Sequence, residues 1–197
     1  MNTANEQTAR QAFKYFNRFM LILWRLGLGS WINFWPDVVG RILVLTHKGR
    51  RTGKYHQTPV NYAVVDGEIY CTAGFGSNAD WYRNIRINPT VEIWLPDGWY
   101  EATAQDLSGS PDRLPILRAV LIASGFAAKA FGEIDPKIIT DEELAAKTSD
   151  YRLIHLDLTS PRTGKGGPGD LAWVWPLATF LLIPLALRRG SGRRRCC

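Results

Sequence analysis

The sequence predicts a mainly β protein with flanking helices, an α+β chain whose strands form a closed or half-closed antiparallel barrel. Three observations support this fold class. Short runs rich in β-branched and aromatic residues follow one another between residues 41 and 106, separated by tight turns. Apolar residues recur at helical spacing near both ends of the chain. With 197 residues, 46% of them hydrophobic and 21% charged, the chain is long enough for one globular domain.

The predicted strands are short and are joined mostly by turn residues. Asp66-Gly67 is a tight hairpin signal, and the residues 96–98 (Pro-Asp-Gly) form another turn. The last strand alternates strictly between apolar and polar residues, as expected for a strand with one buried face. The predicted strands are residues 41–46, 55–65, 68–72, 91–95, 99–106 and 151–158.

Helices are expected on both sides of these strands. Residues 5–28 have apolar residues at spacings of three and four, end at Gly27 and Gly29, and precede an irregular aromatic stretch at 30–37. This helix either packs on the core or lies in a membrane plane with its basic residues on the polar side. Further helices are predicted at 78–87, at 111–131 and after a capping box at 140–143.

The end of the chain differs from the rest in composition. Residues 159–170 are rich in glycine and read as a flexible linker. Residues 171–187 carry no charge; as a helix they cover roughly 25 Å, short of the ~30 Å hydrocarbon core of a bilayer. We therefore expect an interfacial helix, with a single span as the alternative. The domain plan is 1–38, N-terminal helix and aromatic connector; 39–158, barrel; 159–170, linker; 171–197, apolar membrane-associating helix with an Arg-rich tail.

The net charge of +6 comes from this tail, because five of the last ten residues are arginines and about +1 remains without them. A body with so little excess charge is not expected to bind nucleic acid, which requires basic residues along one face. The tail suits an anionic lipid surface and predicts a location at the cytoplasmic face of the membrane, peripheral or tail-anchored. The three cysteines form no disulfide framework, and neither they nor the histidines are spaced as metal ligands.

The most informative segment is the turn between the first two strands. Gly49 and Gly53 permit tight backbone geometry there. The cationic side chains, a hydroxyl and nearby backbone N–H groups suit a phosphate or polycarboxylate; the alternative is a solvated basic hairpin. His47 and His56 flank the turn and are expected to help bind an anion. The turn residues concerned are Lys48, Arg50, Arg51, Thr52, Gly53 and Lys54.

A second glycine-containing loop follows the third strand. Gly74 and Gly76 bracket Phe75, which suits close approach of a flat ring to the backbone or an ordinary turn. The helix predicted after it has Trp81 in its first turn, and its first N–H groups are placed to meet an anion. Trp81 is alternatively a plain core residue.

In their order and spacing these segments resemble the deazaflavin-dependent nitroreductase family, split-barrel enzymes that use coenzyme F420 and include F420H2-dependent quinone reductases. The family pattern is Gly-Arg-basic-Ser/Thr-Gly, then Thr-Pro and Tyr on a strand, Asp-Gly, a glycine loop, and Trp-Tyr-x-Asn-basic-x-x-Asn-Pro. The matching segments are residues 49–53, 58–62, 66–67, 74–76 and 81–89, within a resemblance that covers roughly residues 13–158.

The resemblance implies a split β-barrel of the FMN-binding type that binds reduced F420. The basic turn would bind the phosphate and glutamate tail, and the ring would lie against strand 58–62 and loop 73–76. The acceptor would be a quinone such as menaquinone, with nitro compounds and activated alkenes reduced as well. Tyr62 or a bound water is the expected catalytic proton donor. The expected cofactor-binding residues are Lys48, Arg50, Arg51, Thr52, Gly53, His56, Gln57, Thr58, Pro59, Asn61, Ala73, Gly74, Phe75, Gly76, Trp81 and Asn84.

The sequence departs from the family pattern in two places, and these departures weaken the expectation of nitroimidazole reduction and of a tyrosine proton donor. The loop 73–76 lacks a lysine that many members carry, and residues 131–149 lack the tyrosines of members that reduce nitroimidazoles. Alternatives from other classes are a non-catalytic F420-binding carrier or sensor and an FMN-dependent split-barrel oxidoreductase. Split barrels commonly pair, so a homodimer is one option for the oligomeric state.

Overall fold

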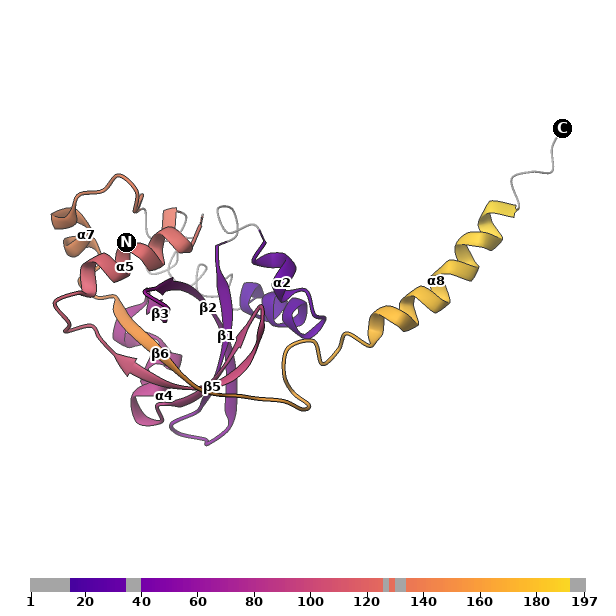
Figure 1. The fold of residues 1–197 in the computed structure, drawn as a ribbon, viewed down its shortest axis with the longest axis horizontal. Helices are drawn as coiled ribbons and strands as arrows, with labels where there is room; N and C mark the ends of the chain where they lie inside the picture. The colour runs from indigo at the N-terminus through magenta and orange to yellow at the C-terminus, as the bar shows by residue number, and fades with distance from the viewer. Residues whose placement is uncertain (1–14, 35–39, 126–127, 130–133, 192–197) are drawn as a thin grey trace.

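The computed structural model describes residues 15–34, 40–125, 128–129 and 134–191. Its strands are antiparallel and form one closed barrel in the order β1-β2-β3-β6-β5-β4 (Figure 1). The predicted antiparallel barrel with flanking helices is therefore confirmed. The strands are β1 Ile42–Lys48, β2 Tyr55–Val65, β3 Glu68–Ala73, β4 Thr90–Leu95, β5 Gly98–Asp106 and β6 Arg152–Pro161.

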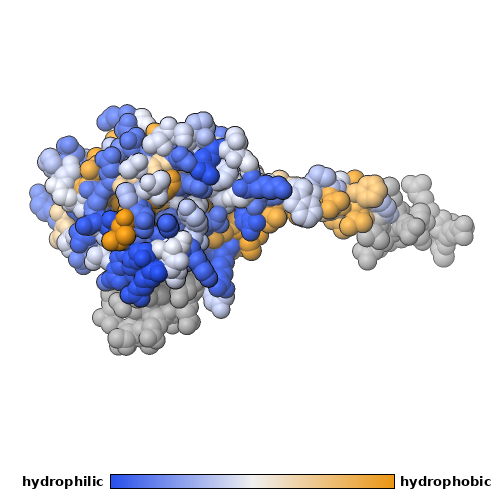
Figure 2. All heavy atoms as spheres, turned by 90° about the horizontal axis from the view of Figure 1, so that it is seen from below, coloured by the Kyte–Doolittle hydropathy of each residue, from blue (hydrophilic) through white to orange (hydrophobic). Residues whose placement is uncertain are grey.

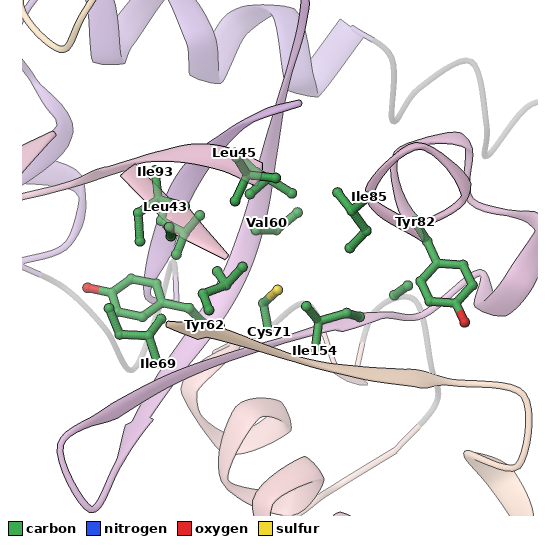
Figure 3. Close-up of a cluster of buried hydrophobic side chains, with 14 of the residues drawn as sticks. Leu43, Leu45, Val60, Tyr62, Ile69, Cys71, Tyr82, Ile85, Ile93 and Ile154 are labelled. Atoms are coloured by element: carbon green, nitrogen blue, oxygen red, sulfur yellow. The ribbon is translucent and has the colours of Figure 1, made fainter. Parts of the chain in front are cut away.

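Side chains fill the interior of the barrel. Alternate residues of each strand point inward, so β1 contributes Leu43 and Leu45 while β2 contributes Val60 and Tyr62 to one buried cluster (Figure 3). Residues of helix α4 (Asp80–Ile87) belong to the same cluster. Helix α4 therefore closes one end of the barrel.

Two helices cover the outside of the barrel. The N-terminal helix, residues 15–25, packs Trp24 against Val44 of β1 and Trp94 of β4. Helix α5 (Arg113–Ala123) packs Val120 against Ala63 of β2 and Leu153 of β6. Part of the outer face of each of the strands β1, β2, β4 and β6 is thereby buried.

The helix boundaries differ from the prediction at glycines. The first helix ends before Gly27, whose φ is +81°, and Gly29 opens the short helix α2 (Gly29–Ile32) in the stretch predicted to be irregular. Gly29 is required there because a Cβ would lie 2.6 Å from the ring of Trp24. Helix α5 ends at Ala123 because Gly125 has a φ of +58°. Residues 5–14 of the first predicted helix, and residues 126–127 and 130–131 of the helix predicted at 111–131, lie outside the described residues.

Two local signals were interpreted correctly. Asp66 and Gly67 both have positive φ, 53° and 88°, in the hairpin between β2 and β3. The Thr140 hydroxyl accepts a hydrogen bond from the backbone N–H of Glu143 at 3.3 Å and caps helix α7 (Asp141–Lys147).

The helix predicted at 78–87 is shorter in the structure. The short 3-10 helix η1 (Gly76–Asn78) precedes it, and α4 begins at Asp80.

The predicted linker is bonded to the body. Strand β6 continues to Pro161, and Arg25 then holds both carboxylate oxygens of Asp170 at 3.1 and 2.9 Å. The indole N–H of Trp175 donates to the carbonyl of Leu26 at 2.8 Å. Helix α8 (Val174–Ser191) runs through Pro184 and projects away from the barrel (Figure 1). No helix in the described ranges has both the length and the apolarity needed to cross a membrane.

Candidate functional site

The α4 end of the barrel brings together three segments that were predicted to bind the cofactor. The turn 49–54 joins β1 to β2 at this end, and β3 ends here with Ala73, which pairs with Arg152 at the start of β6. Loop 74–75 and helix η1 lead directly into α4. The basic turn, the glycine loop and the N-terminus of α4 are therefore neighbours.

Arg50 attaches the turn to α4. Its guanidinium donates to Asp80 Oδ1 at 2.9 Å and to Asn84 Oδ1 at 2.9 Å, and its backbone N–H donates to the same Asn84 oxygen at 3.1 Å. The side chain is only 19% exposed. Arg50 was predicted to bind the anionic end of a cofactor, but the structure directs its charge to an acidic partner within the fold.

The other cations of the turn have no such partner. Lys48, Arg51 and Lys54 are exposed and form no ion pair with any described residue. The backbone N–H groups of Arg51 and Thr52 also lack an acceptor in the described part of the chain. Gly53 has a φ of +68° and lets the turn close on itself. Unneutralised charge beside free N–H groups is the arrangement that binds a phosphate or carboxylate.

His47 lies beneath this turn and is 2% exposed. Its Nδ1 lies 3.2 Å from the amide nitrogen of Asn84, and its Nε2 lies 3.2 Å from the hydroxyl of Thr58. Burial, and then the neighbouring His56 ring stacked at 5.8 Å, lower the pKa of His47 to about 4, against a smaller opposing effect of Asp80. His47 is thus neutral at neutral pH, so any part it takes in binding an anion does not come from a charge on its ring, and that role remains a prediction.

The predicted residues of β2 divide between the two faces of the strand. Thr58 and Tyr62 lie on the inward face with Val60, whereas Gln57, Pro59 and Asn61 alternate onto the outer face. The Asn61 amide donates to the carbonyl of Arg41 at 3.3 Å, near the start of β1. The predicted residues of this strand, which also include His56, therefore do not share one face.

Tyr62, the predicted proton donor, lies within the barrel core. It is 7% exposed and packs among Val60, Ile69 and Cys71 (Figure 3). Burial raises the pKa of its phenol, so the hydroxyl stays protonated at neutral pH. Its role as a proton donor remains a prediction.

The glycine loop has a neighbour that the sequence did not reveal. The ring of Tyr151 lies 3.8 Å from the position a Cβ of Gly74 would occupy, and the Tyr151 hydroxyl has no hydrogen-bond partner among the described residues. Gly76 has a φ of +56°, and a Cβ there would lie 2.3 Å from the carbonyl oxygen of Asp150. The strict alternation of β6 was visible in the sequence, but its pairing with the end of β3 was not. Phe75 is half exposed, and Trp81 packs in part against the barrel core.

Comparison with known proteins identifies the family. A family profile described as F420H(2)-dependent quinone reductase matches residues 32–131, which is half of the chain. The chain belongs to this family. It is therefore an F420-dependent oxidoreductase by family, and the matched region contains the turn, the glycine loop and α4.

Solved structures similar to this chain are distant in sequence. A conserved hypothetical protein from Mycobacterium tuberculosis is 20% identical with a TM-score of 0.45, covering 68% of this chain and 80% of its own. A structure called F420-H2 dependent reductase (FDR-A) is 23% identical with a TM-score of 0.41, covering 59% and 93%. An F420 reductase is 18% identical with a TM-score of 0.38, covering 66% and 94%.

Proposed function

We propose that this protein binds reduced F420 at the α4 end of the barrel and reduces a quinone at a membrane surface. The observation that carries the proposal is the turn after β1. There, Lys48, Arg51 and Lys54 face solvent without an acidic partner among the described residues, and the backbone N–H groups of Arg51 and Thr52 lack an acceptor among them too. These groups suit the phosphate and carboxylates of the coenzyme tail.

The packing of the barrel limits where the coenzyme ring can lie. Residues from all the strands of the barrel and from α4 fill the interior, so a tricyclic ring must lie outside that core. Gly74 is exposed and carries no side chain, which leaves its backbone open to a flat ring beside Tyr151. The bound coenzyme supplies the hydride, and the residues around it position the two reactants.

Two tyrosines are candidates for the proton that a reduced quinone requires. Tyr62 is buried in the core and reaches an acceptor only through a bound water. The Tyr151 hydroxyl lies beside the glycine loop and has no hydrogen-bond partner in the described part of the chain, and partial burial raises its pKa and keeps it protonated. Tyr62→Phe and Tyr151→Phe distinguish them: the variant of the true donor loses turnover with an F420 affinity near that of the wild type.

The exposed apolar residues favour a lipid surface as the place of reaction. Tyr15, Phe19 and Ile22 fall on one face of the N-terminal helix and are 71%, 57% and 53% exposed, while the opposite face packs on the barrel. Apolar residues also gather on α8 and where it leaves the body (Figure 2). Arg25 and Asp170 hold these two regions together. With the arginines at the end of the chain, they suit an anionic membrane at its cytoplasmic face.

The cofactor proposal is tested by titrating purified protein with F420 and, separately, with FMN, following fluorescence. We expect F420 to bind and Arg51→Ala to weaken binding in a salt-dependent manner. Lys165→Ala is the matched control, because Lys165 is also exposed and forms no ion pair with any residue that the structure describes, but lies far along the chain from the turn. Binding of FMN alone would reject the proposal. Oxidation of reduced F420 by menadione separates an enzyme from a carrier, which binds without turnover.

The membrane proposal has its own test. Deleting residues 174–197 is expected to reduce recovery on vesicles containing anionic lipid and to slow the reduction of menaquinone in those vesicles. The rate with water-soluble menadione should not change, because the barrel is left whole. Equal rates with vesicle-bound menaquinone before and after deletion would reject a role for the tail.

A further inference from the structure

We propose that Asn84 and His47 form a directional hydrogen-bond relay that leaves the Thr58 hydroxyl as a donor, and that this hydroxyl binds an acceptor atom of the coenzyme. The inference rests on the proposed use of F420 and specifies what Thr58, one of the expected cofactor-binding residues, presents to the coenzyme. It also assigns His47 as a positioning residue, which acts through Thr58.

The relay begins at the buried amide of Asn84, which is 5% exposed. Its Oδ1 accepts two hydrogen bonds from Arg50, one from the backbone N–H at 3.1 Å and one from the guanidinium at 2.9 Å. An atom that accepts from two N–H donors must be the oxygen of the amide. The NH2 group of Asn84 therefore faces His47.

This orientation determines the tautomer of His47. The Asn84 amide nitrogen lies 3.2 Å from His47 Nδ1, so Nδ1 must be the unprotonated acceptor. In the neutral ring the proton is then on Nε2, which lies 3.2 Å from Thr58 Oγ1 and donates to it. The groups that surround the ring are His56 from β2, Arg50 from the turn, and Asp80 and Asn84 from α4. An added proton on Nδ1 would oppose the Asn84 NH2 group.

The last member of the relay is left with a free proton. Because Thr58 Oγ1 accepts from His47, its own O–H is available to donate to another acceptor, and none is present among the described residues. Thr58 stands where the inward face of β2 meets solvent: Val60 is buried, Thr58 is half buried and His56 is exposed. A ligand held by the turn that extends toward the barrel end passes this hydroxyl, and its carbonyl or phosphate oxygens would accept the hydrogen bond.

The central test compares Thr58→Val with Thr58→Ser in F420 titrations. Valine keeps the shape of threonine and removes the hydroxyl, so we expect about 3- to 10-fold weaker binding, the usual effect of one hydrogen bond. Serine keeps the hydroxyl and should bind within about 2-fold of the wild type. Melting curves of both variants establish that they are folded at the temperature of the titration.

The role of His47 is tested by two substitutions. His47→Gln places an oxygen toward Asn84 and an NH2 toward Thr58, so it preserves the direction of the relay and should restore the affinity. His47→Leu removes the relay, and adding Thr58→Val to it should cost less than Thr58→Val costs alone. A residue with only a packing role would give additive losses.

A readout without coenzyme is the nitrogen NMR spectrum of the free protein. We expect His47 to carry its proton on Nε2 and not on Nδ1. The Nδ1-protonated tautomer would overturn the relay, and equal F420 binding by wild type and Thr58→Val would overturn the role of the hydroxyl while leaving the proposed function intact. A wild-type protein that does not bind F420 would overturn both proposals.

Discussion

The buried, neutral His47 should make the stability of this protein fall as the pH is lowered from about 6.5 to about 4. In the unfolded chain a histidine accepts a proton near its usual pKa of about 6.5, whereas the folded protein resists protonation until a pKa of about 4. Between these values the unfolded chain binds the additional proton, so acid favours unfolding. At about 1.4 kcal/mol for each pKa unit, the free energy of unfolding should decrease by about 3 kcal/mol across this window.

The measurement is urea unfolding of the wild type and of His47→Gln between about pH 7 and about pH 4.5. Glutamine is expected to keep the hydrogen bonds to Asn84 and Thr58 but cannot be protonated in this pH range, so all other titrating groups should contribute equally to both curves. The wild type should lose most of its stability advantage over the variant at the lower pH. Parallel pH profiles of the two proteins would refute the assignment of a buried neutral imidazole.

Three further outcomes follow from the packing. Gly76→Ala should lower the melting temperature and the free energy of unfolding by at least about 1 kcal/mol, because φ is +56° and the new Cβ would meet a carbonyl oxygen. Trp24→Ala should cost about 3 to 5 kcal/mol in urea unfolding, since its ring is 1% exposed against the barrel. In a variant with serine at Cys196 and Cys197, Cys71 should not react with a thiol reagent until urea unfolds the barrel, because burial raises its pKa to about 12.

The parts of the fold that the sequence predicted well are those determined by local signals. Strand β2 has the predicted bounds because alternating residues and the Asp66-Gly67 turn both act within a few residues. The helix predicted at 111–131 was too long. The apolar pattern in the sequence continues past Ser124, but in the structure the helix ends at Ala123 and Gly125 turns the chain. The linker was predicted from composition alone, and its ion pair with Arg25 joins residues 145 apart. Such a contact leaves no pattern in a single sequence.

The candidate site was predicted in part for the same reason. The segments that meet at the α4 end were recognised because each contains its own glycines and basic or aromatic residues. The direction of each side chain was not predictable, since it depends on strand pairing and on partners such as Asp80 and Asn84, 30 and 34 residues from Arg50. The pairing of β3 with β6 brings Tyr151 to Gly74. It joins residues far apart in the sequence, such as Thr72 and Arg152, which are 80 positions apart.

The two neighbouring arginines of the turn are chemically identical but have different surroundings. Arg50 is turned toward α4, where an aspartate neutralises it and its donors orient the Asn84 amide. Arg51 remains in solvent without an ion pair to any described residue. The first arginine thus fixes the position of the turn. In the proposed site it also sets, through Asn84 and His47, the direction of the proton on Thr58, while the second arginine offers its charge to the coenzyme. The proposed site therefore requires both arginines. Without the ion pair of Arg50, the turn would not be held against α4, and the charge of Arg51 would not be positioned next to the Thr58 hydroxyl.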